Sequence, residues 1–388
     1  MNVVEVEGEA QVELFHNFPH KLYEGDSSWV CQPHSLVENI FDIDRNNALK
    51  NGAVCRWLVV SNGEVQGRIA AFVVDTYAQS FEQATGGLGF FECVDDYSVA
   101  ERLFDVAIKW LKNRGMEAVD GPINIGENFF HWGVLTDGFV QPTYGMQYNM
   151  PYYERFFKNY GFKTYYEQYS YQLDITSPNL PERFWKIAER MFNKPGFSYE
   201  QFRFARKDKF INDFMEIYKQ AWTKHGNYKC IEPKDIDSML KASRHMLDED
   251  FIWFVYKEGR PIAIFMMVPD INQLLKKIPN GKLNLINILK LMWYRKRKVI
   301  KRCRVLVMGV VPKYQKSGVE SAIFYKIREV LMRKTWYNQM ELSWVADFNP
   351  KMIAIFKAVG GEHDKTHKTL RYLFDRTKEF KRAEIIKD

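Results

Sequence analysis

The sequence predicts an α+β protein built from two similar units in tandem. The same order of a strand, an amphipathic helix and a second strand occurs once in each half of the chain. With 388 residues, 46% of them hydrophobic, the chain can form two cores, because single domains rarely grow far beyond ~250 residues. We therefore predict a first unit over residues 1–176, a linker with a connecting helix over 177–196, and a second unit over 197–388.

The first unit contains each expected element in chain order. Apolar spacing and turn residues predict a helix, a hairpin closed by Asn62-Gly63, a strand, a helix, a strand and a final strand. These lie over Gln11–Leu22, Arg56–Val60 with Val65–Asp75, Gly86–Cys93, Tyr97–Gly115, the residues around Val119, and Tyr165–Asp174. The connecting helix of the linker is predicted over Glu182–Met191. The second unit then begins with two predicted helices and a hairpin, over Asp208–Lys224, Pro233–His245, Phe251–Lys257 and Pro261–Val268.

The segment Arg304–Lys334 organises the second unit. An apolar, β-branched run ends at Pro312, which has no N–H to give to a sheet. The polar loop that follows carries Gly318, and an amphipathic helix then starts at Val319. Unpaired amides and the helix dipole make such a helix start a site for an anion, here a pyrophosphate.

A second signature follows this helix. Glu341–Val345 is typical of a strand, and Asn349 with Pro350 predicts the start of a helix that ends at Gly360-Gly361. Thr369–Phe374 is expected to be a last strand that closes the second unit.

These two signatures resemble the C-terminal half of the GNAT superfamily of acyl-CoA-dependent N-acyltransferases. The first runs Gln315-Lys316-Ser317-Gly318-Val319-Glu320, and the second runs from Asn349 to Gly360. The resemblance implies two tandem GNAT-like domains, each with a mixed, mostly antiparallel sheet flanked by helices. It also implies acetyl-CoA or another acyl-CoA as cosubstrate and an amine as acceptor.

The resemblance also suggests where the cofactor binds. The backbone of Met308, Gly309 and Val310 would pair with the pantetheine arm, and Asn349 would hold the pantetheine or a bound water. The pyrophosphate would lie against Gln315, Lys316, Ser317, Gly318 and Val319.

Catalysis would need a base for the amine and an acid for the leaving thiolate. Glu341 and Asp347 are the candidate bases, with Asn349 beside them, and each carboxylate can equally be a surface or capping group. Where the family carries a small residue and a tyrosine, this chain has Glu320 and Phe356. Tyr314 and Tyr337 are the nearest tyrosines in sequence that could supply the acid.

The first unit carries Glu92, Asp95 and Asp96 where a pyrophosphate would lie, so we predict a degenerate, structural copy. Residues 121–161 resemble an uncharacterised family of bacterial tandem GNAT-like proteins, through Gly-Pro-x-Asn, Gly-x-Leu-x-Asp-Gly-Phe and Tyr-Asn-x-Pro-Tyr-Tyr. Polar and aromatic residues of these loops are candidates for a substrate-facing wall, with turn and packing chemistry as the alternative. They are Asn124, Asn128, His131, Asp137, Tyr148, Asn149 and Tyr153.

An inserted segment over residues 270–303 separates the hairpin from the motif strand. Its stretch Leu283–Trp293 is apolar on nearly all sides and is followed by a basic run from Arg295. Such a helix can dock on a membrane surface or pack on its own protein with a solvated end. The net charge of +7 suits a polyanionic ligand and gives no reason to expect a nucleic-acid partner.

Five scattered cysteines without Cys-x-x-Cys spacing predict free thiols and no metal site, and the acidic N-terminus shows no signal pattern. A cytoplasmic protein is the expectation. Three functions stay open: an acyl-CoA-dependent N-acyltransferase acting on a small-molecule amine, a non-catalytic CoA-binding or small-molecule-binding protein on the same fold, and an aminoacyl-tRNA-dependent transferase.

Overall fold

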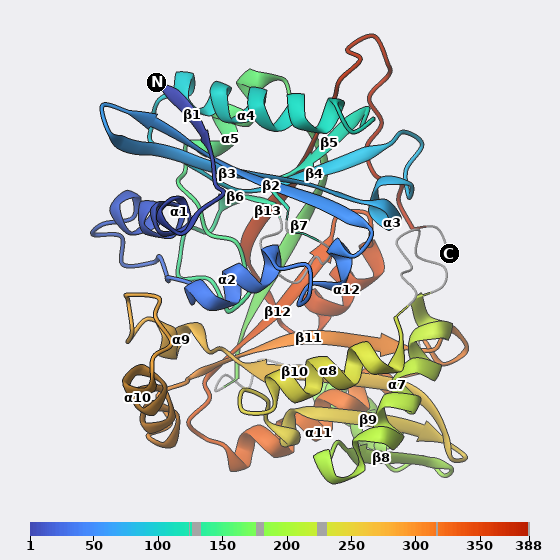
Figure 1. Ribbon diagram of the computed structural model, residues 1–388. Coiled ribbons are helices and arrows are strands. Elements are labelled where there is room, and N and C mark those ends of the chain that lie inside the picture. Colours follow the sequence, from blue (N-terminus) through green and yellow to red (C-terminus); the bar gives the residue numbers. More distant parts are fainter. Residues whose placement is uncertain (124, 126–132, 176–181, 223–230, 316, 387–388) are drawn as a thin grey trace.

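The computed structural model describes the whole chain except residues 124, 126–132, 176–181, 223–230, 316 and 387–388 (Figure 1). The N-terminal half comprises β1 (Asn2–Glu5), α1 (Glu9–Leu22), α2 (His34–Phe41), η1 (Asn47–Leu49), β2 (Gly52–Ser61), β3 (Glu64–Val74), α3 (Asp75–Ala78), β4 (Thr85–Cys93), α4 (Tyr97–Lys112), β5 (Ala118–Gly121), β6 (Val134–Asp137), α5 (Tyr153–Tyr160) and β7 (Lys163–Asp174).

The C-terminal half repeats this order. It comprises α6 (Glu182–Phe192), β8 (Phe197–Gln201), η2 (Phe204–Arg206), α7 (Lys207–Trp222), α8 (Pro233–Ser243), η3 (Glu249–Phe251), β9 (Ile252–Lys257), β10 (Arg260–Pro269), α9 (Asn272–Leu275), α10 (Leu285–Lys296), β11 (Arg302–Val310), η4 (Pro312–Tyr314), α11 (Val319–Arg333), β12 (Gln339–Ala346), α12 (Pro350–Ala358) and β13 (Glu362–Leu373).

The strands form one continuous mixed sheet that runs through both halves. Its order is β1-β2-β3-β4-β5-β13-β7-β12-β11-β10-β9-β8, with β6 attached to β13. The pairs β4–β5 and β11–β12 are parallel, and the other pairs are antiparallel. The predicted α+β class, with a mixed sheet flanked by helices, is confirmed.

Two strands are exchanged between the halves. The last strand, β13, pairs with β5 of the N-terminal half, while β7 of the N-terminal half pairs with β12. The two exchanged strands pair with each other at the centre of the sheet, from Glu362↔Gln172 to Arg371↔Lys163. The expectation that residues 165–174 finish the first unit and that 369–374 close the second is therefore corrected, because each strand pairs with the other half.

An ion pair holds β13 against β5 of the N-terminal half. Arg371 of β13 donates to both carboxylate oxygens of Asp120 on β5, at 2.6 and 2.7 Å, and both side chains are buried. The Arg371 guanidinium also lies 3.6 Å from the centre of the Tyr165 ring on β7. Bidentate pairs of this kind are among the stronger hydrogen-bonded contacts in proteins.

The helices cover the sheet through the apolar stripes that the sequence predicts. The expected stripe of α4, from Ala100 to Leu111, is buried in the core of the N-terminal half, and that of α11, from Val319 to Leu331, in the core of the C-terminal half. The β2–β3 hairpin turns through Asn62 and Gly63, both with positive φ, as predicted. None of the helices in the described residues combines the length and apolar character needed to cross a bilayer.

The strand exchange predicts that neither half folds alone. We expect fragments 1–178 and 179–388, expressed separately, to lack a cooperative thermal transition, because each would leave β5 or β12 without its neighbour. Co-expressed fragments should copurify as one complex with a single transition in circular dichroism. A cooperative transition in fragment 1–178 alone would contradict the exchange.

Candidate functional site

The two parallel strands of the C-terminal half diverge in the middle of the sheet. Among the described residues, β11 and β12 pair only from Arg302↔Gln339 to Val305↔Leu342. Beyond that point β11 stays with β10, as in Met308↔Phe265, while β12 follows β7, as in Val345↔Tyr169. On the side of β12, no strand among the described residues pairs with Met308, Gly309 and Val310, although the Gln315 side chain donates to Val310 O at 3.0 Å. An extended ligand can hydrogen-bond to such an edge.

The equivalent opening in the N-terminal half is closed by the chain itself. After the parallel pairs Thr85↔Ala118 to Gly87↔Asp120, the chain stays beside β4, where Ile123 N donates to Leu88 O at 2.8 Å. A Cβ on Gly89 would lie 2.1 Å from Ile123 O, so the backbones touch. Asp96 accepts from Ser98 N and caps α4. Among the described residues, strand geometry thus leaves this slot open in the C-terminal copy and closes it in the N-terminal copy.

The loop after β11 ends at Gly318, where α11 begins. Gly318 is the N-cap and has φ +90, a left-handed conformation that favours glycine. The first helical bond runs from Ala322 N to Gly318 O, at 3.1 Å, so the amides of Val319 to Ser321 have no acceptor within the helix. These amides and the helix dipole make the start of α11 suitable for an anion.

Part of the predicted cradle is occupied by the loop itself. Tyr314 N donates to Val311 O and Gln315 N to Pro312 O, so these amides serve the η4 turn. The Gln315 side chain donates to Val310 O at 3.0 Å, and the Ser317 hydroxyl donates to Tyr314 O at 2.6 Å. Lys316 lies outside the described residues. Fewer groups than the sequence predicts are therefore available to an anion. The candidate anion site is centred on the first turn of α11.

Three large side chains line this region without having been predicted. The Trp222 ring occupies the place of a side chain at Gly309, because a Cβ there would lie 2.1 Å from the ring. A glycine inside a strand often marks such a close approach, and this was the available signal. Helix α6 approaches Gly318 through Ile187 and Met191, 3.6 Å from its Cβ position.

Glu341 lies at the centre of a buried polar cluster and not at an open site. This cluster, which we call the central polar cluster, consists of Glu341, Lys365, Arg304 and Thr143. Thr143 donates to one Glu341 oxygen at 2.5 Å, Lys365 lies 3.3 Å from the other, and Arg304 lies 3.8 Å away. Burial alone would raise the pKa of Glu341, but Lys365 and Arg304 lower it to about 2. Such a carboxylate is a weak base at neutral pH, so its surroundings favour a structural role.

Asp347 and Asn349 lie at the far end of β12. Asp347 is partly exposed and pairs with Arg382, and burial raises its pKa. Of the two predicted bases it is therefore the better placed to accept a proton. The Asn349 side chain accepts from Met352 N at 3.3 Å, which confirms the predicted cap of α12.

The candidate acids are separated by the fold. Tyr337 precedes β12 at the end away from the divergence and packs on Phe251, with ring centres 5.1 Å apart, so its location argues against the role of acid. Tyr314 belongs to the η4 turn beside the open slot. Phe356 is buried, with the Tyr171 ring edge-on at 5.6 Å. Tyr171 is the tyrosine that the fold, and not the sequence, brings to this position.

Two residues of the predicted substrate wall, Asn149 and Tyr153, are used for packing. Asn149 is 1% exposed and clamps the backbone of Leu135 and Met150 through three hydrogen bonds. Tyr153 is 1% exposed and accepts from Cys93 N. Tyr148 donates to Asp26 at 2.6 Å and lines a small cavity. Asn124, Asn128 and His131 lie outside the described residues.

No protein-family model matches the sequence, but two known proteins are similar to most of the chain. A bacterial ceramide synthase of Caulobacter vibrioides is 26% identical over 376 residues, which cover 95% of this chain and 96% of that protein. Protein YghO of Escherichia coli is 23% identical over 363 residues, which cover 92% of this chain and 91% of that protein.

Solved structures decide the fold. A tandem GNAT protein from the clavulanic acid biosynthesis pathway matches 97% of this chain and 99% of its own, with a TM-score of 0.57 and 10% identity. The chain has the tandem GNAT fold. A GCN5-related N-acetyltransferase from Sphaerobacter thermophilus also matches this fold over 96% of both chains, with a TM-score of 0.54 and 10% identity. A glucosamine N-acetyltransferase region of a fungal GH3 protein matches 96% of this chain and 38% of its own, with a TM-score of 0.57 and 11% identity.

The central polar cluster makes a stability prediction within this tandem GNAT fold. Glu341→Gln should lower the free energy of unfolding by roughly 3–5 kcal/mol, because it removes the buried negative charge that faces both Lys365 and Arg304 and leaves Lys365 with Asp364 alone. A pKa lowered from 4.5 to about 2 stabilises the folded state fully above about pH 5, and this contribution is lost as the pH falls toward 2. Urea unfolding at pH 7 and at pH 3, followed by tryptophan fluorescence, measures both effects.

The matched control is Glu329→Gln, whose carboxylate is 42% exposed and pairs with Lys326 at 2.7 Å. It should change the free energy of unfolding by less than about 1 kcal/mol. Equal effects of the two substitutions would show that the buried pair adds nothing beyond a surface pair.

Proposed function

We propose that the protein is an acyl-CoA-dependent N-acyltransferase whose active site lies in the C-terminal half. The observation that carries this proposal is the divergence of β11 and β12, which leaves a strand edge open beside the start of α11. The open edge of Met308–Val310 suits the amide-bearing pantetheine arm. The first turn of α11 suits the pyrophosphate.

The proposed reaction is direct attack of an amine on the thioester carbonyl. A nitrogen–carbon bond forms, the carbon–sulfur bond breaks, and CoA leaves as a thiolate that takes up a proton. Asp347, with its raised pKa, is the proposed acceptor of the proton that the amine loses. A backbone N–H on the open edge of β11 would stabilise the charge that develops on the carbonyl oxygen.

For the acceptor we propose a long-chain amino alcohol. The support is the whole-length similarity to the bacterial ceramide synthase, since a ceramide is the amide of a long-chain amino alcohol with a fatty acid. The product would then be a lipid, and the acyl donor a fatty acyl-CoA in preference to acetyl-CoA.

Helix α10 supports a lipid substrate, because it presents an apolar surface to solvent. Asn287, Leu291 and Tyr294 form the inward stripe of the helix, and on its outer face lie large apolar side chains that are 41–72% exposed. They are Leu285, Ile286, Ile288, Leu289, Met292 and Trp293. Figure 1 shows α10 at the edge of the molecule, away from the central sheet.

The charge of this segment suits an anionic membrane surface. Residues 283–301 contain Lys290, Arg295, Lys296, Arg297, Lys298 and Lys301, and no acidic residue. An exposed apolar helix face flanked by cations binds at a lipid interface and does not cross it. We therefore propose that α10 brings the protein to the membrane that holds its substrate.

A non-catalytic CoA-binding protein is the second candidate. Glu320 in the first turn of α11 and Phe356 in place of the family's tyrosine favour it. Incubation with palmitoyl-CoA and sphinganine separates the two functions. Thiol release together with the N-acylated product in mass spectrometry supports the transferase, and CoA binding without thiol release from a panel of amines supports the second candidate. Salt-sensitive binding of tRNA would instead favour an aminoacyl-tRNA-dependent transferase.

The start of α11 can be tested with a matched pair of substitutions. Gly318→Asp should raise the Kd for CoA about tenfold or more, because a carboxylate at the N-cap repels the pyrophosphate. Gly318→Asn has the same shape without the charge, and both residue types tolerate positive φ. Isothermal titration with CoA measures the difference. Equal affinities of the two variants would place the pyrophosphate elsewhere.

Membrane docking by α10 can be tested by cosedimentation. The double substitution Leu289→Glu and Trp293→Glu should reduce binding to phosphatidylglycerol vesicles about tenfold or more, because it places two charges on the apolar face. Met239→Glu is the control, since Met239 is also about half exposed but lies on α8. A dimer in solution that the double substitution dissociates would show that a second copy covers this face, and would overturn the proposal.

A further inference from the structure

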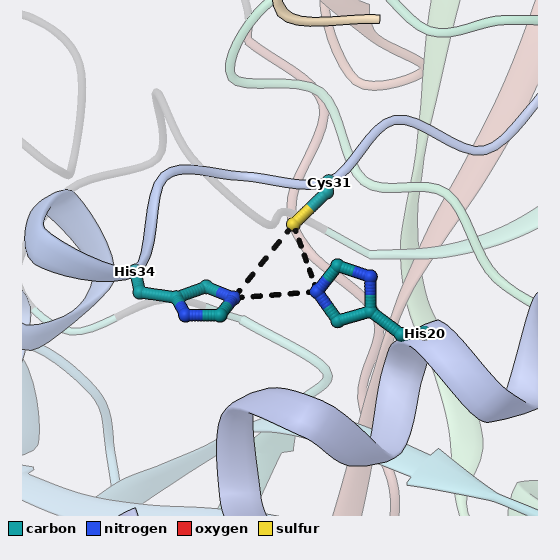
Figure 2. Close-up of side chains that lie close together, drawn as sticks. All are labelled: His20, Cys31 and His34. Carbon is teal, nitrogen blue, oxygen red and sulfur yellow. Dashed lines mark hydrogen bonds between the residues drawn. The ribbon is translucent and has the colours of Figure 1, made fainter. Parts of the chain in front are cut away.

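Three side chains of the types that ligate metals converge where α1, the loop after it and α2 meet. They are His20 in the last turn of α1, Cys31 in the following loop, and His34 at the start of α2. The Nε2 atoms of the two histidines are 3.3 Å apart, and the Cys31 Sγ lies 3.4 Å from the first and 3.9 Å from the second (Figure 2). Figure 2 shows all three ligand atoms pointing toward one another.

We propose that His20, Cys31 and His34 bind a zinc ion, with a water molecule at the fourth position. Zinc takes imidazole nitrogens at about 2.0–2.1 Å and thiolate sulfur at about 2.3 Å in tetrahedral geometry. These bond lengths imply nitrogen–nitrogen and nitrogen–sulfur separations of about 3.4 and 3.6 Å between ligands. The observed separations lie close to both values, so little movement is needed.

The chemistry of the three groups suits the proposal. Neutral imidazole nitrogens and a thiolate sulfur are common ligands of zinc, and the thiol must lose its proton to bind the metal. Binding therefore forms two nitrogen–metal bonds and one sulfur–metal bond and releases the thiol proton, with no redox step.

The surroundings hold the ligands in place. The His16 ring stacks on His34 with centres 4.4 Å apart, and His16 Nε2 lies 2.7 Å from Glu38. The Trp29 ring stands edge-on to His20 at 5.2 Å. Ordered neighbours of this kind fix the orientation of metal ligands.

Space beside the three side chains gives an ion access to the cluster. A Cβ on Gly281 would lie 2.6 Å from His34 Nε2 and 2.8 Å from Cys31 Sγ, so only glycine leaves this face of the cluster clear. A cavity of about 430 Å³ opens beside His34 and is lined also by His16, Glu38 and Lys282. This cavity gives an entry path for the ion and for its water ligand.

The ion would stabilise the junction between the two halves. Its ligands belong to the N-terminal half, whereas Gly281 belongs to the segment inserted in the C-terminal half and accepts from His34 N at 2.9 Å. Lys276 of the same insert donates to Ser27 O at 2.5 Å. A bound ion would fix α1, the loop and α2 against this insert.

Hydrogen bonding alone could also hold these groups together, since the Cys31 thiol lies 3.3 Å from Gln32 O and can donate to it. Metal content and cobalt spectra of the full-length protein decide between the two arrangements. We expect the purified protein to carry about one zinc per chain by plasma mass spectrometry. After chelation, Co²⁺ should produce the visible bands of a tetrahedral site and a thiolate charge-transfer band.

Matched variants locate the ligands. Cys31→Ser should abolish the thiolate charge-transfer band, His34→Ala should lower zinc retention about tenfold or more, and both variants should lose the zinc-dependent rise in Tm. Cys55→Ser, at a buried thiol outside the cluster, should retain the metal, the band and the rise in Tm. Wild-type protein that binds neither zinc nor cobalt, or a charge-transfer band that persists in Cys31→Ser, would overturn the proposal.

Discussion

The antiparallel pairing of β7 with β13 is the contact on which the rest of the structure depends. Each strand has crossed into the other half, and together they join two half-sheets into one. Strand β12 pairs with both β11 and β7 from Gln339 to Leu342, and with β7 alone at Val345 and Ala346. The opening to which we assign the pantetheine arm therefore lies directly beside the exchanged strands.

The two halves make different use of the same architecture. In the N-terminal half the chain after β5 continues beside β4, and Asp96 caps the helix that follows β4. In the C-terminal half α11 begins at Gly318 without a side-chain cap, and β11 and β12 diverge. The central polar cluster lies between these halves and joins β11, β12, β13 and the loop of Thr143.

The parts of the structure that could be predicted are those encoded in local patterns. The apolar stripes of α4 and α11, the Asn62-Gly63 turn and the Asn349 cap depend on neighbours a few residues away, and the sequence displays them. Local sequence patterns do not reveal the strand exchange, since β13 would have the same residue pattern whichever half it paired with. The burial of Glu341 follows from that exchange, because its partner Lys365 lies on β13.

The candidate metal ligands depend on contacts that spacing alone does not show. The Cys31-x-x-His34 pair is visible in the sequence, but a pair of this kind does not indicate a metal site without a third ligand. The third ligand, His20, joins them only because α1 ends beside the loop. Packing also determines the position of Tyr171, whose ring lies against Phe356 from a strand 185 positions earlier in the chain.

The crossing of β13 has a consequence for synthesis of the protein on the ribosome. Residues 362–373 are synthesised long after β5, yet β5 needs them as its neighbour. Until β13 has left the ribosome, the edge of β5 is unpaired on this side and the Asp120 carboxylate lacks Arg371, so native pairing of the first half can finish only after β13 has been translated. A nascent chain with such an unprotected edge is exposed to aggregation, and we expect its yield in cells to depend on chaperones that bind ribosome-associated intermediates.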